Sequence, residues 1–407
     1  MQACGVGETI PADEASWRYS GWRIVAVLLL VEVAIFGFGL FGQGIYLAEL
    51  RRLNGWPTGV IAAGSTLCLV LGSLLSMFVS ELLRWIGPRA LVLAGIAALA
   101  SGLALLATAD SIPQLYAGFV VLSLGWVGLG TITAAAIIGA WFEHKRGLAI
   151  SITFSGSTLS GILLVPALVS VVDTAGLRQG LGAAAVLAFI ILAPLVAGVI
   201  RFPQALERPT VDAAPAVPSL SRAELLRDGS FWYLTLAFAF AILVQVAFIV
   251  HQVSILTPSI GFQSVGAVLS LTMAMSLTGR IALGIIADRI DPRRAAAVSI
   301  VSQAAALSVL GLTTGVVELV IACAVFGFSM GNLITLPTLI VQREFPRDAF
   351  SMVLGLSMAI AGVINACGPM AMGFLRDITG GYVTPIFIGV AVQLASALAV
   401  LVARRTR

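Results

Sequence analysis

Four ionisable side chains lie inside or at the ends of long apolar runs of this sequence: Glu32, Glu81, His251 and Arg280. An ionised side chain at the centre of a bilayer costs at least about 2.5–3.5 kcal/mol on insertion scales. Such residues are kept where they bind an ion, relay a proton or meet a charged partner. Arginine offers anion binding, and carboxyl and imidazole groups offer proton exchange.

Arg280 lies seven residues before the end of its apolar run, which places it about 10 Å inside that end of a helix. This depth is too great for the side chain to reach the bilayer surface comfortably. Its planar guanidinium binds a carboxylate through two parallel hydrogen bonds, so it suits capture of an organic anion in a dry cavity. The alternative is a structural arginine bound to helix carbonyls or to Glu32.

Glu32 lies eight residues into the first apolar run, at a depth of about 12 Å that nearly matches the depth of Arg280. If the two side chains approach one another, a proton taken up by Glu32 would release Arg280 to an incoming anion, which couples proton and substrate. Glu32 could instead be a structural partner or an acid that faces a water-filled groove. His251 lies twenty residues after Phe231, at the outer interface, as a satisfied histidine or as a proton relay.

The composition excludes several classes of protein. Of the 407 residues, 59% are hydrophobic and only 10% are charged, with a formal net charge of +4. A soluble domain carries roughly a quarter charged residues, so a cytosolic enzyme, a disordered chain and a nucleic-acid-binding protein are all disfavoured. The two histidines, His144 and His251, form no His-Glu-x-x-His motif, so we expect no metal site, no cofactor and no intramembrane metalloprotease.

Twelve apolar stretches are long enough to cross a bilayer core about 30 Å thick as helices. They are residues 24–48, 59–83, 89–108, 112–140, 147–173, 179–200, 231–256, 265–287, 294–314, 316–342, 351–375 and 382–402. Their length and continuous apolar character differ from the short alternating strands of a membrane barrel. The sequence therefore predicts an all-α membrane protein with 12 transmembrane helices.

Basic residues predict the orientation. With the N-terminus inside the cell, 18 of the 23 Arg and Lys residues fall in tails and loops on the cytoplasmic side. This asymmetry is the positive-inside pattern, and it predicts that both termini are cytoplasmic.

An internal repeat predicts two halves. Residues 86–89 (IGPR) match residues 290–293 (IDPR), and Pro166 matches Pro369, at an offset of about 203 residues. We therefore expect two pseudo-symmetric six-helix bundles with a substrate site between them near the bilayer midplane. The predicted organisation is a tail at 1–23, a bundle at 24–200, a cytoplasmic linker at 201–230, a bundle at 231–402 and a tail at 403–407.

Residues 284–294 (GIIADRIDPRR) resemble the signature loop of the major facilitator superfamily, and the similarity extends over essentially the whole chain. In the first half, residues 80–89 (SELLRWIGPR) place Arg84 where the family has Asp. Finer motifs resemble bacterial monocarboxylate-porter-like and oxalate/formate-antiporter-like members. These motifs are GWRIV at 21–25, NGW at 54–56, WFEHKRGLA at 141–149 and GPMAMGFLRDITGGY at 368–382.

The resemblance implies a secondary transporter of a small organic monocarboxylate, similar to lactate or pyruvate, that works by alternating access with Arg280 as the carboxylate ligand. It implies a monomer in the bacterial cytoplasmic membrane, with a proton as the coupling ion and lipid around it. Ser276 stands where eukaryotic porters have an acid, and the first span has no lysine, so the proton route differs. The alternatives are an oxalate/formate-like anion exchanger, an exporter of a hydrophobic anion, and a sensor without turnover.

Two further groups of residues complete the predicted site. Polar and aromatic side chains at mid-depth are candidates to line a substrate cavity: Gln43, Trp126, Phe154, Gln245, Asn332 and Asn365. Asp288, held by Arg289 or Arg293, would lie against the positive N-terminal end of the span at 351–375 and close the cytoplasmic side. Glu81 is the corresponding gate residue of the first half.

Overall fold

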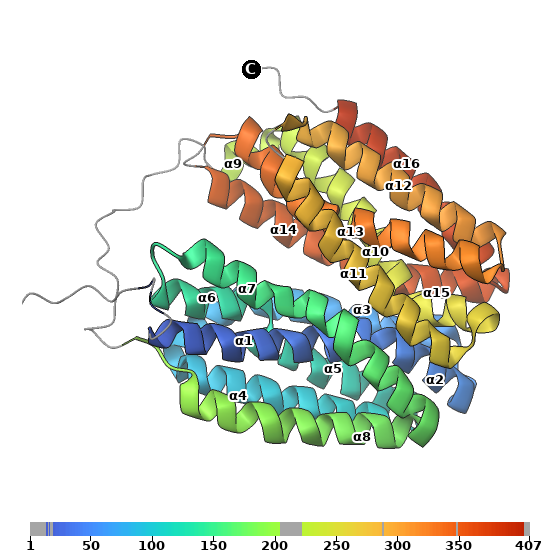
Figure 1. Ribbon diagram of the computed structural model, residues 1–407, viewed down its shortest axis with the longest axis horizontal. Coiled ribbons are helices and arrows are strands. Elements are labelled where there is room, and N and C mark those ends of the chain that lie inside the picture. Colours follow the sequence, from blue (N-terminus) through green and yellow to red (C-terminus); the bar gives the residue numbers. More distant parts are fainter. Residues whose placement is uncertain are drawn as a thin grey trace, which may run out of the picture.

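The computed structural model describes residues 14, 16, 19–203, 222–286, 289–346 and 349–402, and all regular structure in these ranges is helical (Figure 1). The elements are α1 (Ser20–Phe36), η1 (Gly37–Phe41), α2 (Gln43–Asn54), α3 (Thr58–Leu75), η2 (Ser76–Phe78), α4 (Val79–Ala107), α5 (Ile112–Leu129), α6 (Thr131–Trp141), α7 (Arg146–Leu159), η3 (Ser160–Leu164), α8 (Val165–Val199), α9 (Arg222–Arg227), α10 (Gly229–Ile260), α11 (Phe262–Ile286), α12 (Pro292–Leu312), α13 (Val316–Glu344), α14 (Phe350–Ala366), α15 (Gly368–Thr379) and α16 (Val383–Val402).

Ten helices in the described part of the chain are long and apolar enough to cross a membrane. Two of them, Thr58–Ala107 and Arg146–Val199, are 50 and 54 residues long, which is more than twice the length that a bilayer core of about 30 Å requires. Each of these two helices contains one glycine with a non-helical backbone, Gly87 at φ 78° and Gly176 at φ 82°. A positive φ is readily adopted by glycine alone, so each glycine divides its helix into two arms.

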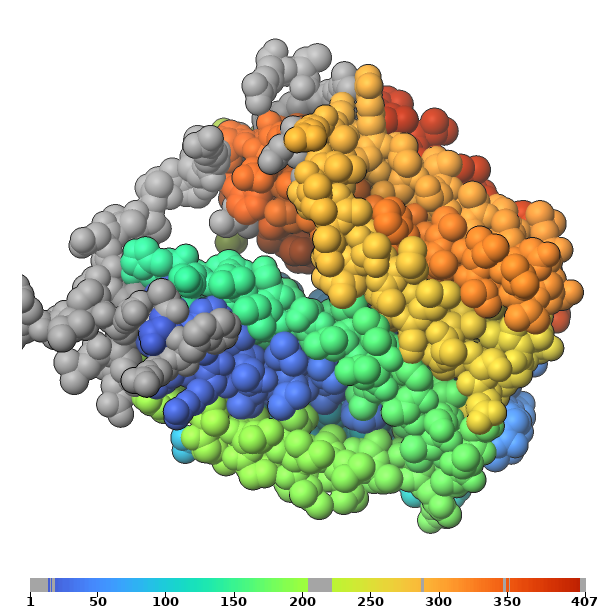
Figure 2. All heavy atoms as spheres, in the orientation of Figure 1, coloured from blue at the N-terminus to red at the C-terminus, as the bar shows by residue number. Residues whose placement is uncertain are grey.

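The helices form two bundles, α1–α8 and α9–α16 (Figure 1). The bundles meet where α3 packs against α14 and α15, α8 packs against α11, and α2 packs against α10. At the opposite end they diverge, and Figure 2 shows a hollow between the surface of α6 and α7 and the surface of α11 and α14. We call this hollow the central cleft.

The repeated loops make equivalent contacts in the two bundles. Arg89 donates a hydrogen bond from Nε to the carbonyl of Ile200, 3.1 Å away at the end of α8. Arg293 donates from Nη1 to the carbonyl of Val400, near the end of α16. In each half, the arginine after the second span therefore satisfies a carbonyl that the last helix of its bundle leaves free.

Close packing holds α11 against α13. A Cβ atom added to Gly327 would lie 2.2 Å from the carbonyl oxygen of Thr272, and one added to Gly331 would lie 2.0 Å from that of Ser276. Small residues let membrane helices approach this closely, and the backbone of α11 is fixed as a result. The helix that carries Arg280 thus has a rigid support on one side.

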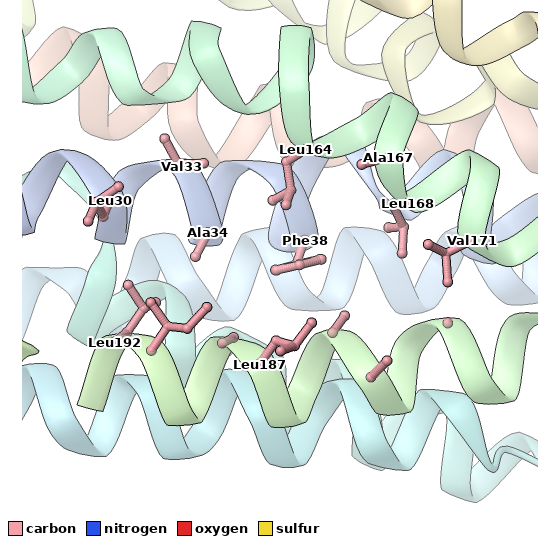
Figure 3. A pocket seen from close by; sticks show the side chains of 15 residues that line it. Leu30, Val33, Ala34, Phe38, Leu164, Ala167, Leu168, Val171, Leu187 and Leu192 are labelled. Atoms are coloured by element: carbon pink, nitrogen blue, oxygen red, sulfur yellow. The ribbon is translucent and has the colours of Figure 1, made fainter. Parts of the chain in front are cut away.

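The outer surface of the first bundle has an apolar groove of about 330 Å³ between α1 and α8 (Figure 3). All 15 residues of its lining are apolar, among them Phe38, Leu164 and Leu187. A groove without a polar group cannot hold a charged substrate in a fixed orientation, so this groove suits the acyl chains of lipid.

Candidate functional site

Arg280 lies on the face of α11 that points toward the first bundle. Earlier on this face, Ser270 Oγ donates a 2.9 Å hydrogen bond to the carbonyl of Ile162, and Met273 contacts Gly161. Arg280 follows Met273 by seven residues, which is two helical turns or about 10 Å, on nearly the same side of the helix. Arg280 therefore lies two turns beyond the Met273 contact, toward the end of α11 that borders the central cleft.

The guanidinium of Arg280 has no counter-charge among the residues that the structure describes. Its Nε atom is buried without a hydrogen-bond partner, while the side chain as a whole is partly exposed. A guanidinium that is partly withdrawn from water without an anion is costly, and a bidentate carboxylate would satisfy it. The guanidinium of Arg280 therefore has capacity for an anion in this conformation.

Glu32 is fully buried in α1, and neither of its carboxyl oxygens has a hydrogen-bond partner. Its side chain packs against α7, where a Cβ atom added to Gly156 would lie 2.8 Å from Glu32 Cβ. No ion pair within 4 Å joins Glu32 and Arg280 in the described chain. The two residues with the strongest case for transport chemistry are therefore separate in this conformation, each without a partner.

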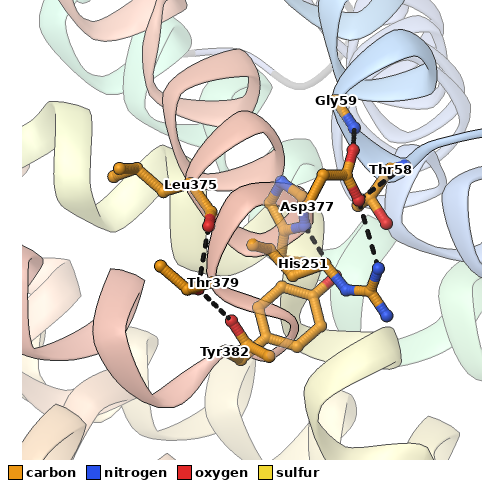
Figure 4. Close-up of polar contacts among 9 residues, drawn as sticks. Thr58, Gly59, His251, Leu375, Asp377, Thr379 and Tyr382 are labelled. Carbon is orange, nitrogen blue, oxygen red and sulfur yellow. Dashed lines mark hydrogen bonds and ion pairs between the residues drawn. The ribbon is translucent and has the colours of Figure 1, made fainter.

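His251, on α10, is fully buried near the end of the second bundle that carries Tyr382 and Asp377. Its Nε2 lies 2.9 Å from the carbonyl of Pro369. Its Nδ1 lies 3.0 Å from the hydroxyl of Tyr382, as Figure 4 shows. A carbonyl can only accept, so Nε2 carries a hydrogen and Nδ1 is free to accept from Tyr382. Both nitrogens are satisfied, which is the structural alternative for this residue.

Three of the predicted cavity residues lie on the first bundle. Gln43 is fully buried and donates from Nε2 to the carbonyl of Gly39, so it spans the break between η1 and α2. Trp126 packs on Phe36, with ring centroids 5.1 Å apart. Phe154 is partly buried against the core of this bundle and lies on α7, which borders the central cleft.

Asn365 is the cavity residue of the second bundle with the strongest position. It is partly exposed on α14, three residues after Gly362, which faces Ser73 of α3 across the bundle interface. Its side-chain amide makes no hydrogen bond with any described residue. Its donors and acceptor are thus available to a bound molecule.

Gln245 and Asn332 point into the second bundle, contrary to the prediction that they line the substrate cavity. Gln245 accepts a 2.9 Å hydrogen bond from Gln303, which in turn accepts one from Gln393 at 2.9 Å. Asn332 donates a 3.3 Å hydrogen bond to Ser299 of α12. Amides in an apolar interior pair with one another across helices, and this pairing decided their direction.

The predicted cytoplasmic gate differs from the structure in its arginine. Arg293 is only 3% exposed and binds Glu344 at the end of α13, with Nη2 2.7 Å from Oε2. Together with its bond to Val400, this pair ties α12, α13 and α16 within one bundle and does not bridge the two bundles. Glu344 was not predicted as its partner.

Among the described residues, Glu81 and Arg289 form no ion pair between the bundles either. Glu81 lies 3.6 Å from Arg84 of its own helix, and Arg289 is exposed. Asp288 lies outside the described residues.

A polar contact at the opposite end joins the two bundles and was not predicted from the sequence. The carboxylate of Asp377, on α15, accepts hydrogen bonds from the backbone N–H groups of Thr58 at 3.1 Å and Gly59 at 2.6 Å (Figure 4). These are free N–H groups at the start of α3, where the helix dipole is positive. Arg376 donates to the same carboxylate at 3.1 Å. We call this contact the Asp377 latch.

Small residues allow the Asp377 latch to form. A Cβ atom added to Gly373 would lie 2.9 Å from Ala62 Cβ and 3.1 Å from Gly59 Cα, so α3 and α15 nearly touch. Gly373, Asp377 and Tyr382 all belong to the motif at 368–382, whose spacing was the signal that could have found the contact. The bundles are closed at this end and open at the end of the central cleft.

Comparison with known proteins adds independent information. The sequence profile of the Major Facilitator Superfamily matches residues 27–356 and 258–407. Monocarboxylate transporter 13 of Rattus norvegicus is 25% identical over 403 residues, covering 96% of this chain and 89% of that protein. The oxalate:formate antiporter of Oxalobacter formigenes is 34% identical over 159 residues, covering 37% of this chain and 36% of that protein.

Solved structures share the fold at low sequence identity. A nucleoside transporter aligns with a TM-score of 0.75 at 13% identity, covering 95% of this chain and all of that one. A bacterial homologue of the human lysosomal transporter Spinster, in an inward-facing and occupied conformation, aligns with a TM-score of 0.71 at 15% identity, covering 95% and 96%. Together with the family match along nearly the whole chain, these similarities show that the protein is a multi-pass membrane transporter, not an enzyme, and that it belongs to the Major Facilitator Superfamily.

Proposed function

We propose that this protein carries a small organic monocarboxylate across the membrane, with Arg280 as the ligand of the carboxylate. The observation that carries the proposal is the guanidinium of Arg280, whose buried Nε has no hydrogen-bond partner, two turns beyond the contact of Met273 with Gly161 and toward the central cleft. The similarity to monocarboxylate transporters and to an oxalate:formate antiporter supports the same class of substrate. Asn365 would bind a second oxygen of the substrate, and Phe154 and Trp126 would pack on its carbon atoms.

The proposed topology has twelve spans, because the helices broken at Gly87 and Gly176 each supply two. Basic residues concentrate on the loops and tails at the open end, so we assign that end, and both termini, to the cytoplasm of a bacterial cell. In this assignment the structure is the inward-open state, with the Asp377 latch sealing the outside. The tail, bundle and linker boundaries given above apply to this arrangement, and the unit is one chain.

We assign proton coupling to Glu32. A buried carboxyl without a partner can take up or release a proton when a charge nearby changes, because its ionised form needs compensation. As the bundles rock, an anion on Arg280 and the ionised carboxyl of Glu32 would compete for the same positive charge. Binding of the anion to Arg280 would therefore favour binding of a proton to Glu32. His251 has both nitrogens satisfied and is assigned a structural role.

An anion-exchange function is the second candidate, and the match to the oxalate:formate antiporter favours it. Against a dicarboxylate substrate stands the absence of a basic residue from Phe350 to Leu375, since one cation favours one carboxylate. The third candidate, export of a hydrophobic anion, would use the same arginine.

Uptake by the purified protein in liposomes tests these candidates. A labelled panel of monocarboxylates and dicarboxylates is supplied with and without an inward proton gradient. We expect monocarboxylates to accumulate several-fold above equilibrium only with the gradient. Accumulation that requires internal anion and ignores pH would replace proton coupling by exchange, and no uptake of any acid would contradict the proposed substrate class.

The variant Glu32→Gln distinguishes proton coupling from movement of the substrate itself across the membrane. Gln has the same shape and cannot release a proton, so we expect gradient-driven accumulation to fall to the equilibrium level while exchange of internal for external substrate continues. The measurement is a paired uptake and counterflow assay in the same liposomes. Glu318→Gln, at an exposed site on α13, is the control and should behave as wild type. Full gradient-driven accumulation by Glu32→Gln would remove Glu32 from the coupling route.

A further inference from the structure

A second groove of about 530 Å³ lies on the second bundle, and its lining differs from that of the apolar groove in Figure 3. It runs between α11 and α12, and α13 forms its floor, since both helices pack on α13. Its walls are apolar along Leu283, Ile286 and Val298, and the last two side chains are 45% and 66% exposed. In a membrane protein such exposed apolar walls face lipid.

Two arginines stand at one end of this groove. Arg289 and Arg294 line it, are exposed, and form no ion pair with any described residue. They lie in the short connection after α11 and in the first turn of α12, which is the depth of the lipid headgroups for helices that span the bilayer. One acid, Asp291, also lines this end, where it caps α12 by accepting from the N–H of Arg293 at 2.9 Å.

Polar groups with unused hydrogen-bonding capacity lie deeper in the groove. Asn332 is 8% exposed, and its Nδ2 donates to Ser299 Oγ at 3.3 Å while its Oδ1 has no partner. The Ser299 hydroxyl accepts this bond, and its own hydrogen has no acceptor among the described residues. Ser299 follows Pro292 by seven residues, so this pair lies about 10 Å below the start of α12.

The order in which charged, polar and apolar groups follow one another along the groove matches one class of molecule. A glycerophospholipid has an anionic phosphate, then ester carbonyls, then acyl chains, in the order in which the groove offers arginines, a free hydroxyl and apolar walls. We propose that this groove binds an anionic phospholipid, with the phosphate on Arg289 and Arg294 and an ester carbonyl on Ser299. Asn332 positions the Ser299 hydroxyl by donating to it.

The bound lipid would act on the helix that carries the substrate ligand. Gly279, which precedes Arg280, lines the groove, so the groove and the central cleft lie on different sides of the same turn of α11. A lipid in the groove would hold this turn against α13. This inference needs only the membrane location of the chain and does not depend on which anion is transported.

Lipid retention by the purified full-length protein tests the site. We would titrate detergent-solubilised protein with phosphatidylglycerol and, separately, with phosphatidylcholine, and count bound lipids by native mass spectrometry. Basic residues near a membrane contribute about 1 kcal/mol each toward an anionic lipid, so two of them predict a preference of about 30-fold for phosphatidylglycerol. Arg289→Gln/Arg294→Gln should lose this preference.

Two further variants distinguish the groove from general attraction of charge. Arg222→Gln/Arg227→Gln removes the same charge from exposed positions on α9 and should keep the preference. Val298→Trp keeps both arginines and fills the groove, so it should reduce retention of phosphatidylglycerol. Equal retention by Arg289→Gln/Arg294→Gln and wild type, or an equal loss in the α9 control, would overturn the proposal. Competition by inorganic phosphate at millimolar concentration would assign the arginines to a free anion instead.

Discussion

Substitution of Arg280 is expected to abolish transport, with the initial rate of monocarboxylate uptake reduced at least 30-fold in Arg280→Gln. Removing one partner of a desolvated charge pair costs about 2–5 kcal/mol, which is a factor of about 30 or more in affinity. Arg280→Lys keeps the charge and loses the planar fork, so we expect a smaller loss of about 10-fold. Two quantities are measured. The first is the initial uptake rate in liposomes. The second is the substrate affinity in detergent, for which the fluorescence of Trp126 and the other tryptophans is the signal.

The exposed Arg178 of α8 provides the matched control, because Arg178→Gln removes the same charge away from the central cleft. Its uptake and affinity should equal those of wild type. Thermal unfolding of each variant in detergent checks that Arg280→Gln is folded. If folded Arg280→Gln protein transports at the rate of wild type, Arg280 is not the anion ligand, and the proposed binding mode is wrong.

Loss of the Asp377 latch is expected to open the outer end of the protein. Asp377→Ala removes the acceptor of two backbone hydrogen bonds at the start of α3, and hydrogen bonds to a charged group contribute about 1.5–3 kcal/mol. At about 2 kcal/mol, after allowance for the partly exposed carboxylate, the ratio of closed to open molecules should fall about 30-fold. Spin labels at Leu53→Cys and Thr379→Cys, exposed sites near this end, would report the opening as a longer distance.

The control for this experiment is Asp173→Ala, which removes an exposed acid near the same end of the first bundle. It should leave the distance distribution between the spin labels unchanged. Asp377→Asn retains one acceptor oxygen and should give an intermediate population. An unchanged distribution in Asp377→Ala would mean that packing of Gly373 on Gly59 and Ala62 holds the outer end closed without the carboxylate.

Local features of the sequence determined the class of protein and most of the helices. Long apolar runs must be helical in lipid, because every backbone N–H and carbonyl then finds its partner within its own segment. The glycine and proline at 87–88 ended one such run and began another, and this information is also local. The cost of a charge in hydrocarbon identified Arg280 before any contact was known.

The tertiary structure decided the directions and partners of polar side chains. Gln245 and Asn332 point into the second bundle because they form hydrogen bonds there with Gln303 and Ser299. These two partners lie 58 and 33 positions away in sequence. His251 is satisfied by two groups more than 100 positions away. The spacing of residues within one helix predicts which of them share a face. Which other helix packs against that face is decided only by the tertiary structure.

The contact that closes one end of the bundles, the Asp377 latch, was likewise not predicted from the sequence. Asp377 lies in the motif at 368–382, but its partners are backbone N–H groups 318 and 319 positions away, which no side chain in the sequence identifies. Arg293, read as part of a gate between the halves, instead pairs with Glu344 inside one bundle. The sequence by itself determined that this chain is a helical membrane transporter with an arginine suited to an anion. Only the tertiary structure decided which end is closed and by which residues, because that depends on contacts between bundles that are far apart along the chain.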